Sequence, residues 1–189
     1  MNNLITKTTE LAMFVTLSYI KPGDTVVDAT CGTGQDTLAL AQAVGEEGKV
    51  YAFDVQMKAL ILTETHLHAH GIRNVHLLKE SFASIGDHVP EGSVAAVVFN
   101  LGYLPGGDHS ITTEKEETLK GLEEALKVIR PGGVVTAVLY DGHEEGQEEK
   151  AAVISWAEQL DSKKYHAVYA NMLNQKNHPP EILWITKKK

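Results

Sequence analysis

Hydrophobic and polar positions follow two different periods along the chain. Short apolar runs, typical of strands buried on both faces, occupy residues 25–29, 49–53, 75–78, 94–99 and 134–139. Apolar residues three and four positions apart predict helices over the first 20 residues and over 36–44, 56–70, 112–129 and 144–160. Two more strands are predicted at about 165–172 and 182–186, with no helix between them.

This alternation predicts an α/β fold. Strands separated by helices form βαβ units, which build a mostly parallel sheet with helices on both faces. We expect the last two strands to pair as an antiparallel hairpin, because no helix separates them. In an open sheet of this kind, ligands bind beyond the carboxyl ends of the strands, near the switch in strand order. The residues that directly follow each strand are therefore the candidates for chemistry.

Length, composition and charge restrict the class of protein. The 189 residues are 43% hydrophobic and 22% charged, which is typical of one globular domain over residues 1–189 and excludes wholesale disorder. The net charge of −8 argues against an indiscriminate nucleic-acid binder. Residues 161–189 differ from the rest, with six lysines and two acidic residues. Because no apolar run is long enough to cross a membrane, we expect a cytoplasmic protein without a membrane partner.

Three smaller observations complete this picture. We expect the first 20 residues to be a helix that packs on the domain and not a signal peptide, because Glu10 interrupts the apolar stretch. The single cysteine, Cys31, excludes an internal disulfide and fits a reducing compartment. His66 and His70 share a helix face, but no third ligand is suitably spaced, so we expect no metal site.

The turn after the first strand carries the clearest motif, Asp-Ala-Thr-Cys-Gly-Thr-Gly-Gln over residues 28–35. Gly32 and Gly34 allow the backbone to approach a ligand closely, and the next helix directs its N-terminus toward that ligand. The second strand ends at Asp54, 20 residues after Gly34, where a carboxylate can accept hydrogen bonds from both hydroxyls of a ribose. The spacing therefore predicts a cofactor that contains a ribose.

Two further residues narrow the choice of cofactor. Asp28 lies within the turn, where a carboxylate suits an ammonium group better than the pyrophosphate of a dinucleotide. Thr37 occupies the place of the third glycine in the dinucleotide fingerprint. The expected ligand combines a ribose with a cationic end, as S-adenosylmethionine (SAM) does. A nicotinamide-dependent oxidoreductase is disfavoured for the same reasons.

Three stretches resemble the YtqB/MnmM family of rRNA methylases. They are D-x-x-C-G-T-G-Q at 28–35, F-N-L-G-Y-L-P-G-G-D-H at 99–109, and G-H-E-E-G at 142–146 with N-Q-x-N-x-P-P at 174–180. The resemblance spans nearly the whole chain and implies a Rossmann-like class I methyltransferase fold with seven strands. It also implies SAM as cofactor and methylation of 5-aminomethyl-2-thiouridine at the wobble position of tRNA, with the anticodon stem-loop as partner.

In the resembled fold, the adenine lies after the third strand, here at Ser81 and Phe82, and Gln56 flanks it. We expect Cys31 to be a small buried residue and not a nucleophile, because it follows neither the fourth nor the fifth strand. The expected cofactor-binding set is Asp28, Cys31, Gly32, Thr33, Gly34, Gln35, Asp36, Asp54, Gln56, Ser81, Phe82 and Asn100.

The fourth strand ends in Asn100-Leu101-Gly102-Tyr103. Methyltransferases that act on exocyclic amines place an N/D-P-P-Y/F motif here, and this chain keeps both ends of the motif and lacks both prolines. We expect the Oδ1 atom of Asn100 and the carbonyl of Leu101 to accept hydrogens from an amine, and Tyr103 to stack on a base. In the alternative interpretation, Asn100 caps a turn and Tyr103 packs on its own loop.

An alkylamine is largely protonated at neutral pH and must lose a proton before it can attack a methyl group. Asp108, His109 and His143 are candidate proton acceptors, and no spacing argument separates them. A solvated loop with a helix cap is an equal interpretation of the first two. Residues after the later strands are candidates for substrate contacts: Tyr140, His143, Asn174, Gln175, Lys176 and Asn177. The last four also suit a hairpin loop rich in turn formers.

Other functions stay open at this point. The chain suits a methyltransferase that acts on ribosomal RNA or on a small-molecule amine, and it suits a SAM-binding protein without catalysis. Salt dependence separates the first two, because RNA binding weakens steeply with salt and the binding of a small amine does not. A homodimer would help so small a domain to span an anticodon stem-loop, although no motif indicates one.

Overall fold

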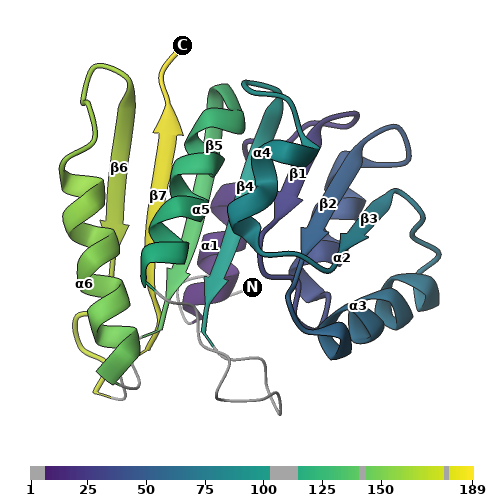
Figure 1. Ribbon diagram of the computed structural model, residues 1–189, viewed down its shortest axis with the longest axis horizontal. Coiled ribbons are helices and arrows are strands. Elements are labelled where there is room, and N and C mark those ends of the chain that lie inside the picture. The colour runs from purple at the N-terminus through teal and green to yellow at the C-terminus, as the bar shows by residue number, and fades with distance from the viewer. Residues whose placement is uncertain (1–6, 103–114, 141–143, 177–178) are drawn as a thin grey trace.

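The computed structural model describes residues 7–102, 115–140, 144–176 and 179–189. One sheet runs through these residues, with the strand order β3-β2-β1-β4-β5-β7-β6 (Figure 1). Its strands are β1 (Thr25–Asp28), β2 (Lys49–Phe53), β3 (Val75–Leu78), β4 (Val94–Leu101), β5 (Ile129–Leu139), β6 (Tyr165–Ala170) and β7 (Glu181–Lys187).

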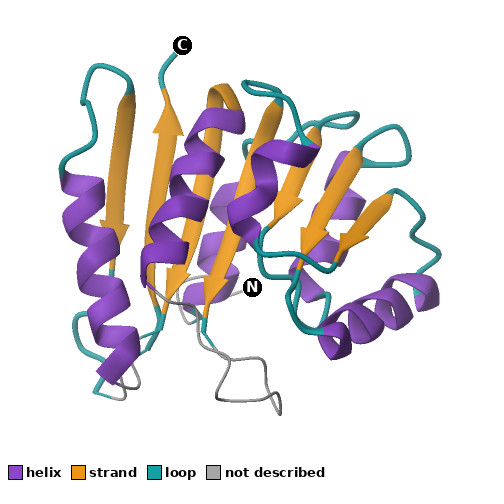
Figure 2. Ribbon diagram, viewed as in Figure 1, coloured by secondary structure: helices purple, strands orange, loops and turns teal. Residues whose placement is uncertain are grey.

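The direction of the strands confirms the predicted fold class. β1 to β5 are mutually parallel, and β7 pairs antiparallel with both β5 and β6. β6 therefore runs parallel to β5, and the loop after β6 lies at the same edge as the carboxyl ends of β1, β2 and β4 (Figure 2). β1 pairs with β2 on one side and with β4 on the other, which makes its carboxyl end the switch point of the sheet.

Helices cover both faces of the sheet. α4 (Ile85–His88), α5 (Lys115–Val128) and α6 (Glu144–Glu158) lie in front of it in Figure 1, and α1 (Thr8–Leu17) and α2 (Gln35–Val44) lie behind it. α3 (Met57–Ala69) packs on α2. No helix within the described ranges is both long and apolar enough to span a bilayer.

The core has two layers because successive side chains along a strand point to opposite faces. Val27 of β1 and Phe99 of β4 belong to the layer that contains Leu122 of α5. The neighbouring Val26 belongs to the opposite layer, with Leu40 of α2. The continuously apolar strands of the sequence thus fill both layers, as strands covered on both faces do.

Three local features differ from the sequence prediction. A 3₁₀ turn (Phe82–Ser84) and α4 follow β3, and neither was predicted, because both are too short to show helical periodicity. The predicted helix over 112–129 ends at Val128, and Ile129 already pairs in β5. Residues 130–133, between the predicted helix and the predicted strand, instead belong to β5 and form a bulge, where a Cβ on Gly133 would come within 2.9 Å of the carbonyl oxygen of Ala95.

An ion pair joins two strands at the amino edge of the sheet. Asp24, directly before β1, accepts hydrogen bonds of 2.5 and 2.8 Å from the guanidinium of Arg130 at the start of β5. The Asp24 side chain is only 12% exposed. Burial opposes its ionisation, but the hydrogen bonds from Arg130 and from the N–H of Lys21, together with the charge of Arg130, lower the pKa of Asp24 below its ordinary value.

Candidate functional site

The turn after β1 depends on glycine at position 34. Gly34 has a φ of 83° and directly precedes α2, and its carbonyl accepts the N–H of Leu38. A Cβ at this position would lie 2.9 Å from the Cα of Thr63 in α3, closer than non-bonded carbon atoms approach. Gly34 is therefore required both by its left-handed backbone and by the packing of α3. The hydroxyl of Thr63 also donates to the carbonyl of Gly32, at 3.2 Å.

Asp28 at the end of β1 holds the turn together from within. Its side chain has no exposed surface, and its carboxylate accepts the hydroxyl of Thr37 at 2.6 Å and the N–H of Thr30 at 3.1 Å. Burial, and next the charge of Asp36, raise the pKa of Asp28 to about 7, although these two hydrogen bonds oppose the rise. Contact with a cofactor ammonium group stays a prediction, because the buried carboxylate already serves the turn.

Asp54 joins the end of β2 to the same turn. Its two carboxylate oxygens accept the N–H of Gly32 at 3.1 Å and the N–H of Gln56 at 2.9 Å. Burial raises the pKa of Asp54, and both backbone hydrogen bonds oppose the rise. The side chain is partly exposed, which leaves it accessible to a ligand, and its contact with the hydroxyls of a ribose stays a prediction.

The other residues of the turn differ in their exposure. Cys31 is buried, and its N–H donates to the carbonyl of Phe53. Burial, with the charge of Asp28, raises the pKa of the Cys31 thiol far above its ordinary value, which suits a packing residue and not a nucleophile. Thr33 is partly exposed and Gln35 is exposed at the first residue of α2.

Asn100 and Asp36 meet at the carboxyl end of β4. The Nδ2 atom of Asn100 donates to the Oδ2 atom of Asp36, at 2.5 Å, and the backbone N–H of Asn100 donates to the hydroxyl of Thr30, at 2.7 Å. Burial raises the pKa of Asp36, and the hydrogen bond from Asn100 lowers it in part. Asn100, the first residue of the Asn-Leu-Gly-Tyr motif, is thus linked directly to the residues around the turn after β1.

The ring of Tyr140 packs beside Gly102, just after β4. Tyr140 directly follows β5, and its ring lies so close to Gly102 that a Cβ there would be 3.0 Å from the ring carbon Cδ2. The N–H of Gly102 donates back to the carbonyl of Asn100, at 3.1 Å, which makes the backbone turn sharply after β4. Burial, with the charge of Asp36, raises the pKa of Tyr140.

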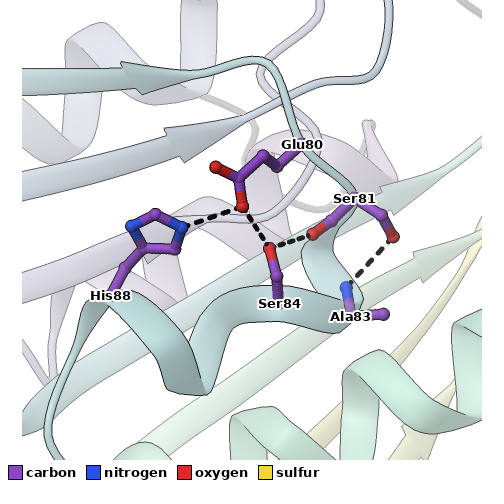
Figure 3. A network of polar contacts seen from close by, with 5 residues as sticks. All are labelled: Glu80, Ser81, Ala83, Ser84 and His88. Carbon is purple, nitrogen blue, oxygen red and sulfur yellow. Dashed lines mark hydrogen bonds and ion pairs between the residues drawn. The ribbon is translucent and has the colours of Figure 1, made fainter.

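The region after β3 is held by a polar network (Figure 3). The hydroxyl of Ser81 accepts the N–H of Ala83 at 3.1 Å and donates to the carboxylate of Glu117 on α5. Ser84 donates to the carbonyl of Ser81 at 2.8 Å and to Glu80 at 2.9 Å, and Glu80 also pairs with His88 at 2.9 Å. This network fixes the loop in which the adenine was expected.

The side chain of Phe82 in this loop packs into the core. Its ring is buried edge-on against Phe99, with centroids 5.5 Å apart, and a Cβ on Gly121 of α5 would lie 2.3 Å from it. Only the backbone of Phe82 is left for the predicted adenine contact, since its side chain belongs to the core.

The remaining candidates divide into two groups. Asn174, Gln175 and Lys176 are exposed in the loop after β6, at the carboxyl edge, but four strands away from β1 in the sheet. The others lie outside the described residues: Tyr103, Asp108, His109, His143 and Asn177.

Sequence reasoning missed several polar partners in this site. Thr37 was noted only as a missing glycine, yet its hydroxyl binds Asp28. No local sequence pattern indicated the roles of three further residues, because each binds a partner at least 31 residues away in the chain. They are Thr30, Thr63 and Glu117. Within the described ranges, no group of three His, Cys, Asp or Glu side chains is placed to hold a metal ion.

The strand order, the glycine turn at the switch point and the carboxylate at the end of β2 define the class I SAM-dependent methyltransferases. The residues fit this cofactor, because Gly34 leaves no side chain over the turn and Asp54 faces it with a partly exposed carboxylate. Residues 50–186 match the family model described as "Putative rRNA methylase", and the chain belongs to this family. A model of protein-L-isoaspartate O-methyltransferases matches residues 1–81.

Relatives of established name agree with this class. A chloroplastic tRNA (mnm(5)s(2)U34)-methyltransferase of Arabidopsis thaliana is 40% identical in an alignment of 179 residues that covers 89% of this chain and 65% of the plant protein. The demethylmenaquinone methyltransferase of Geobacillus stearothermophilus is 30% identical over 119 residues, which are 63% of this chain and 46% of that enzyme. The chain therefore spans less than two thirds of either relative.

Solved structures resemble the chain over almost its full length. A Clostridium thermocellum protein that carries the family's description is 39% identical, with a TM-score of 0.93 over 96% of this chain and 98% of its own. A Streptococcus mutans methyltransferase in complex with SAH is 34% identical, with a TM-score of 0.87 over 96% and 98% of the two chains. SAH is SAM without its transferred methyl group. The predicted fold, enzyme class and cofactor are thus confirmed.

Proposed function

We propose that this protein transfers a methyl group from SAM to the aminomethyl nitrogen of 5-aminomethyl-2-thiouridine at the wobble position of tRNA. The observation that carries the proposal is Asn100, held by Asp36 and Thr30 at the carboxyl end of β4, beside the cofactor turn. The name of the Arabidopsis relative supports the same substrate.

The described residues supply binding and orientation. When bound, SAM provides an electrophilic methyl group. Asp54 would accept the ribose hydroxyls, and the turn with Gly32 and Gly34 would lie along the cofactor. Asn100 would accept a hydrogen of the amine through Oδ1, and the carbonyl of Leu101 would accept another, so that the nitrogen lone pair points at the methyl carbon. Most of the acceleration then comes from proximity and orientation of the two reacting atoms.

The amine must be neutral when it attacks, so a proton has to leave it. Asp108, His109 and His143 remain our candidates for its acceptor, and Tyr103 for stacking on the base. All four lie outside the described residues, and the proposal rests on their place in the family motifs and not on their geometry.

The anticodon stem-loop is the proposed partner. The loop after β6, with Asn174, Gln175 and Lys176, is exposed at the catalytic edge. It belongs to the segment 161–189, which carries six of the seventeen basic residues. Phosphate contacts by these lysines would counteract the overall charge of −8 and would make binding weaken steeply as salt rises.

Ribosomal RNA is the second candidate substrate, because the description of the family model names it. One experiment separates the two. The purified protein is incubated with methyl-labelled SAM and, separately, with bulk tRNA and ribosomal RNA from cells that lack the protein, and the digested nucleosides are analysed by mass spectrometry.

Label on 5-aminomethyl-2-thiouridine is the expected result. Label only in ribosomal RNA would overturn the tRNA proposal in favour of the second candidate. No label in either RNA, with SAM binding intact, would overturn both and direct the search to small-molecule amines.

A further inference from the structure

We propose that Asp36 is a positioning residue that fixes the side-chain amide of Asn100, so that its Oδ1 atom faces the amine to be methylated. The inference deepens the proposed function and rests on it for the identity of the amine. It replaces the sequence expectation that Asp36 contacts the cofactor with a role that acts through Asn100.

The first step is the chemistry of the pair. An ionised carboxylate only accepts hydrogen bonds, whereas an amide has a donor end and an acceptor end. The 2.5 Å contact between Asp36 and Asn100 is therefore satisfied in one orientation of the amide, with Nδ2 toward Asp36. The opposite orientation would place two acceptor oxygens against each other.

The second step is the rigidity of the backbone beneath the amide. The N–H of Asn100 is bound by the hydroxyl of Thr30, whose own N–H is bound by the buried Asp28. On the other side, Gly102 turns back onto the carbonyl of Asn100 and packs under Tyr140. With the Cα of Asn100 held by these contacts, rotation of its amide is the remaining freedom, and Asp36 removes it.

The third step is the direction left for Oδ1. Among the described residues, no hydrogen bond to the Oδ1 atom of Asn100 is found, so within this part of the chain the oxygen is open to a donor of the substrate. An acceptor oxygen held in place before substrate arrives costs no reorganisation during the reaction. A nitrogen with two hydrogens and one lone pair is oriented by such an acceptor, because a hydrogen bonded to Oδ1 fixes where the lone pair points.

The hydrogen bond from Asn100 also favours the ionised form of Asp36. Burial raises the pKa of Asp36, and the hydrogen bond from Asn100 opposes part of this rise. The groups around it are Asp28 at the end of β1, Tyr140 after β5 and Asn100 on β4. Asn100 thus stabilises the ionised carboxylate, and the ionised carboxylate in turn sets the orientation of Asn100.

A double-mutant cycle tests this dependence. Asp36→Asn keeps the shape of the side chain but can present either an oxygen or an NH2 group to Asn100, so we expect kcat to fall about 10- to 100-fold. Asn100→Ala should lower kcat about 100-fold or more. The double variant should be no slower than Asn100→Ala alone, because Asp36 has no other route to the reaction. The Kd for SAM should stay within about twofold throughout.

Asp87→Asn is the matched control. Asp87 is exposed on α4, and the same chemical change there should leave kcat and the SAM Kd as in the wild type. Two results would overturn the inference. One is a double variant in which the two losses multiply, which would give Asp36 an independent role. The other is an Asp36→Asn variant whose Kd for SAM rises as much as kcat/KM falls, which would make Asp36 a cofactor ligand.

A second measurement does not need the RNA substrate. In the SAH-bound protein, the side-chain ¹⁵N–¹H signals of Asn100 are identified by their absence in Asn100→Ala. We expect one amide proton to be shifted downfield and to exchange slowly in the wild type and in Asp87→Asn, and to lose both properties in Asp36→Asn. Unchanged signals in Asp36→Asn would overturn the positioning role. If these signals behave as expected but the tRNA gains no label in the methyl-transfer experiment, the result would contradict the proposed function and leave the positioning role intact.

Discussion

The two edges of the sheet use aspartate in opposite ways. At the amino edge, Asp24 is bound by the guanidinium of Arg130, and its pKa is lowered. At the carboxyl edge, Asp28, Asp36 and Asp54 accept hydrogen bonds from neutral hydroxyl, amide and backbone groups, and burial raises the pKa of each.

The difference separates stability from function. A carboxylate that has a bound cation stabilises the folded chain at neutral pH, whereas buried carboxylates with neutral donors destabilise it. Three such groups within one turn and its neighbouring strand are costly unless a ligand uses their charge and acceptor oxygens. We infer that the carboxyl edge gives up stability to prepare the proposed site for a cationic cofactor and an amine.

Asn100→Ala is the variant that should affect the carboxyl edge most. We expect methyl transfer to fall about 100-fold or more, since a fixed acceptor for the reacting amine is lost. The free energy of unfolding and the Kd for SAM should change little, because Asn100 is partly exposed. Single-turnover kinetics and calorimetric titration with SAM check the two parts. Turnover equal to the wild type would remove Asn100 from the mechanism.

Arg130→Met is the corresponding change at the amino edge. It leaves Asp24 nearly buried without its cation, and we expect a loss of about 2 kcal/mol in the free energy of unfolding. The Kd for SAM should not change, because the pair lies at the opposite edge from the cofactor turn. Urea unfolding measures the loss. Arg130→Lys keeps the charge without the two-pronged contact and should lose about half as much; full stability in Arg130→Met would contradict our account of the pair.

Gly34→Ala tests the tight packing of the cofactor turn, with Gly23→Ala as its match. Both glycines have a left-handed backbone, with φ of 83° and 86°, but a Cβ meets nothing within 4 Å at Gly23 and meets Thr63 at 2.9 Å at Gly34. Gly23→Ala should destabilise the fold by about 1 kcal/mol. Gly34→Ala should cost about 1 kcal/mol more and should also weaken SAM binding. If both variants lose the same free energy of unfolding and SAM binding is unchanged, α3 must be able to shift away from the added Cβ at little cost.

The pH dependence of stability should show the opposite signs of the two edges. The raised pKa of Asp28, about 7, means that the folded chain holds a proton that the unfolded chain has lost. Its contribution is present at acidic pH and is lost as pH rises toward 7, by at most about 1.4 kcal/mol per pH unit. The lowered pKa of Asp24 contributes stability above its unfolded pKa and loses it as pH falls further.

Two isosteric variants measured by urea unfolding from about pH 2 to pH 8 separate these two contributions, because the range has to extend below the unfolded pKa of Asp24. Asp28→Asn should become more stable relative to the wild type as pH rises, because it removes a buried charge. Asp24→Asn should be less stable than the wild type at neutral pH and should approach it as pH falls. Parallel pH curves for all three proteins would show that neither carboxyl group has a shifted pKa.

Periodicity predicted the frame of this molecule well because the strands are buried. β2 and β3 begin and end at the predicted residues, and the lack of a helix before β7 correctly indicated the antiparallel hairpin. The predictions were weaker where short-range signals compete. The strand was predicted to begin only at residue 134, but Gly132 and Gly133 are small enough to allow a bulge, so that β5 begins at Ile129.

The site was predictable by position and not by partner. The rule that ligands bind after the strands pointed to Asp28, Asp54 and Asn100. No local pattern could indicate that Asn100 binds Asp36, because the two are 64 residues apart and the contact depends on how β4 aligns with β1. Phe82 shows the converse: its position after β3 was informative, but only packing against Phe99 and α5 reveals that its ring belongs to the core.

The place of β7 has a consequence for how the sheet is assembled during synthesis. β7 follows β6 in the chain but lies between β5 and β6 in the sheet. Consequently β6 cannot join the growing sheet until the ribosome has released the strand that comes after it. β1 to β4 can make their pairings earlier, because all four strands precede β5 in the chain. A translating chain therefore builds its cofactor turn first, and the loop proposed to meet RNA takes its place last.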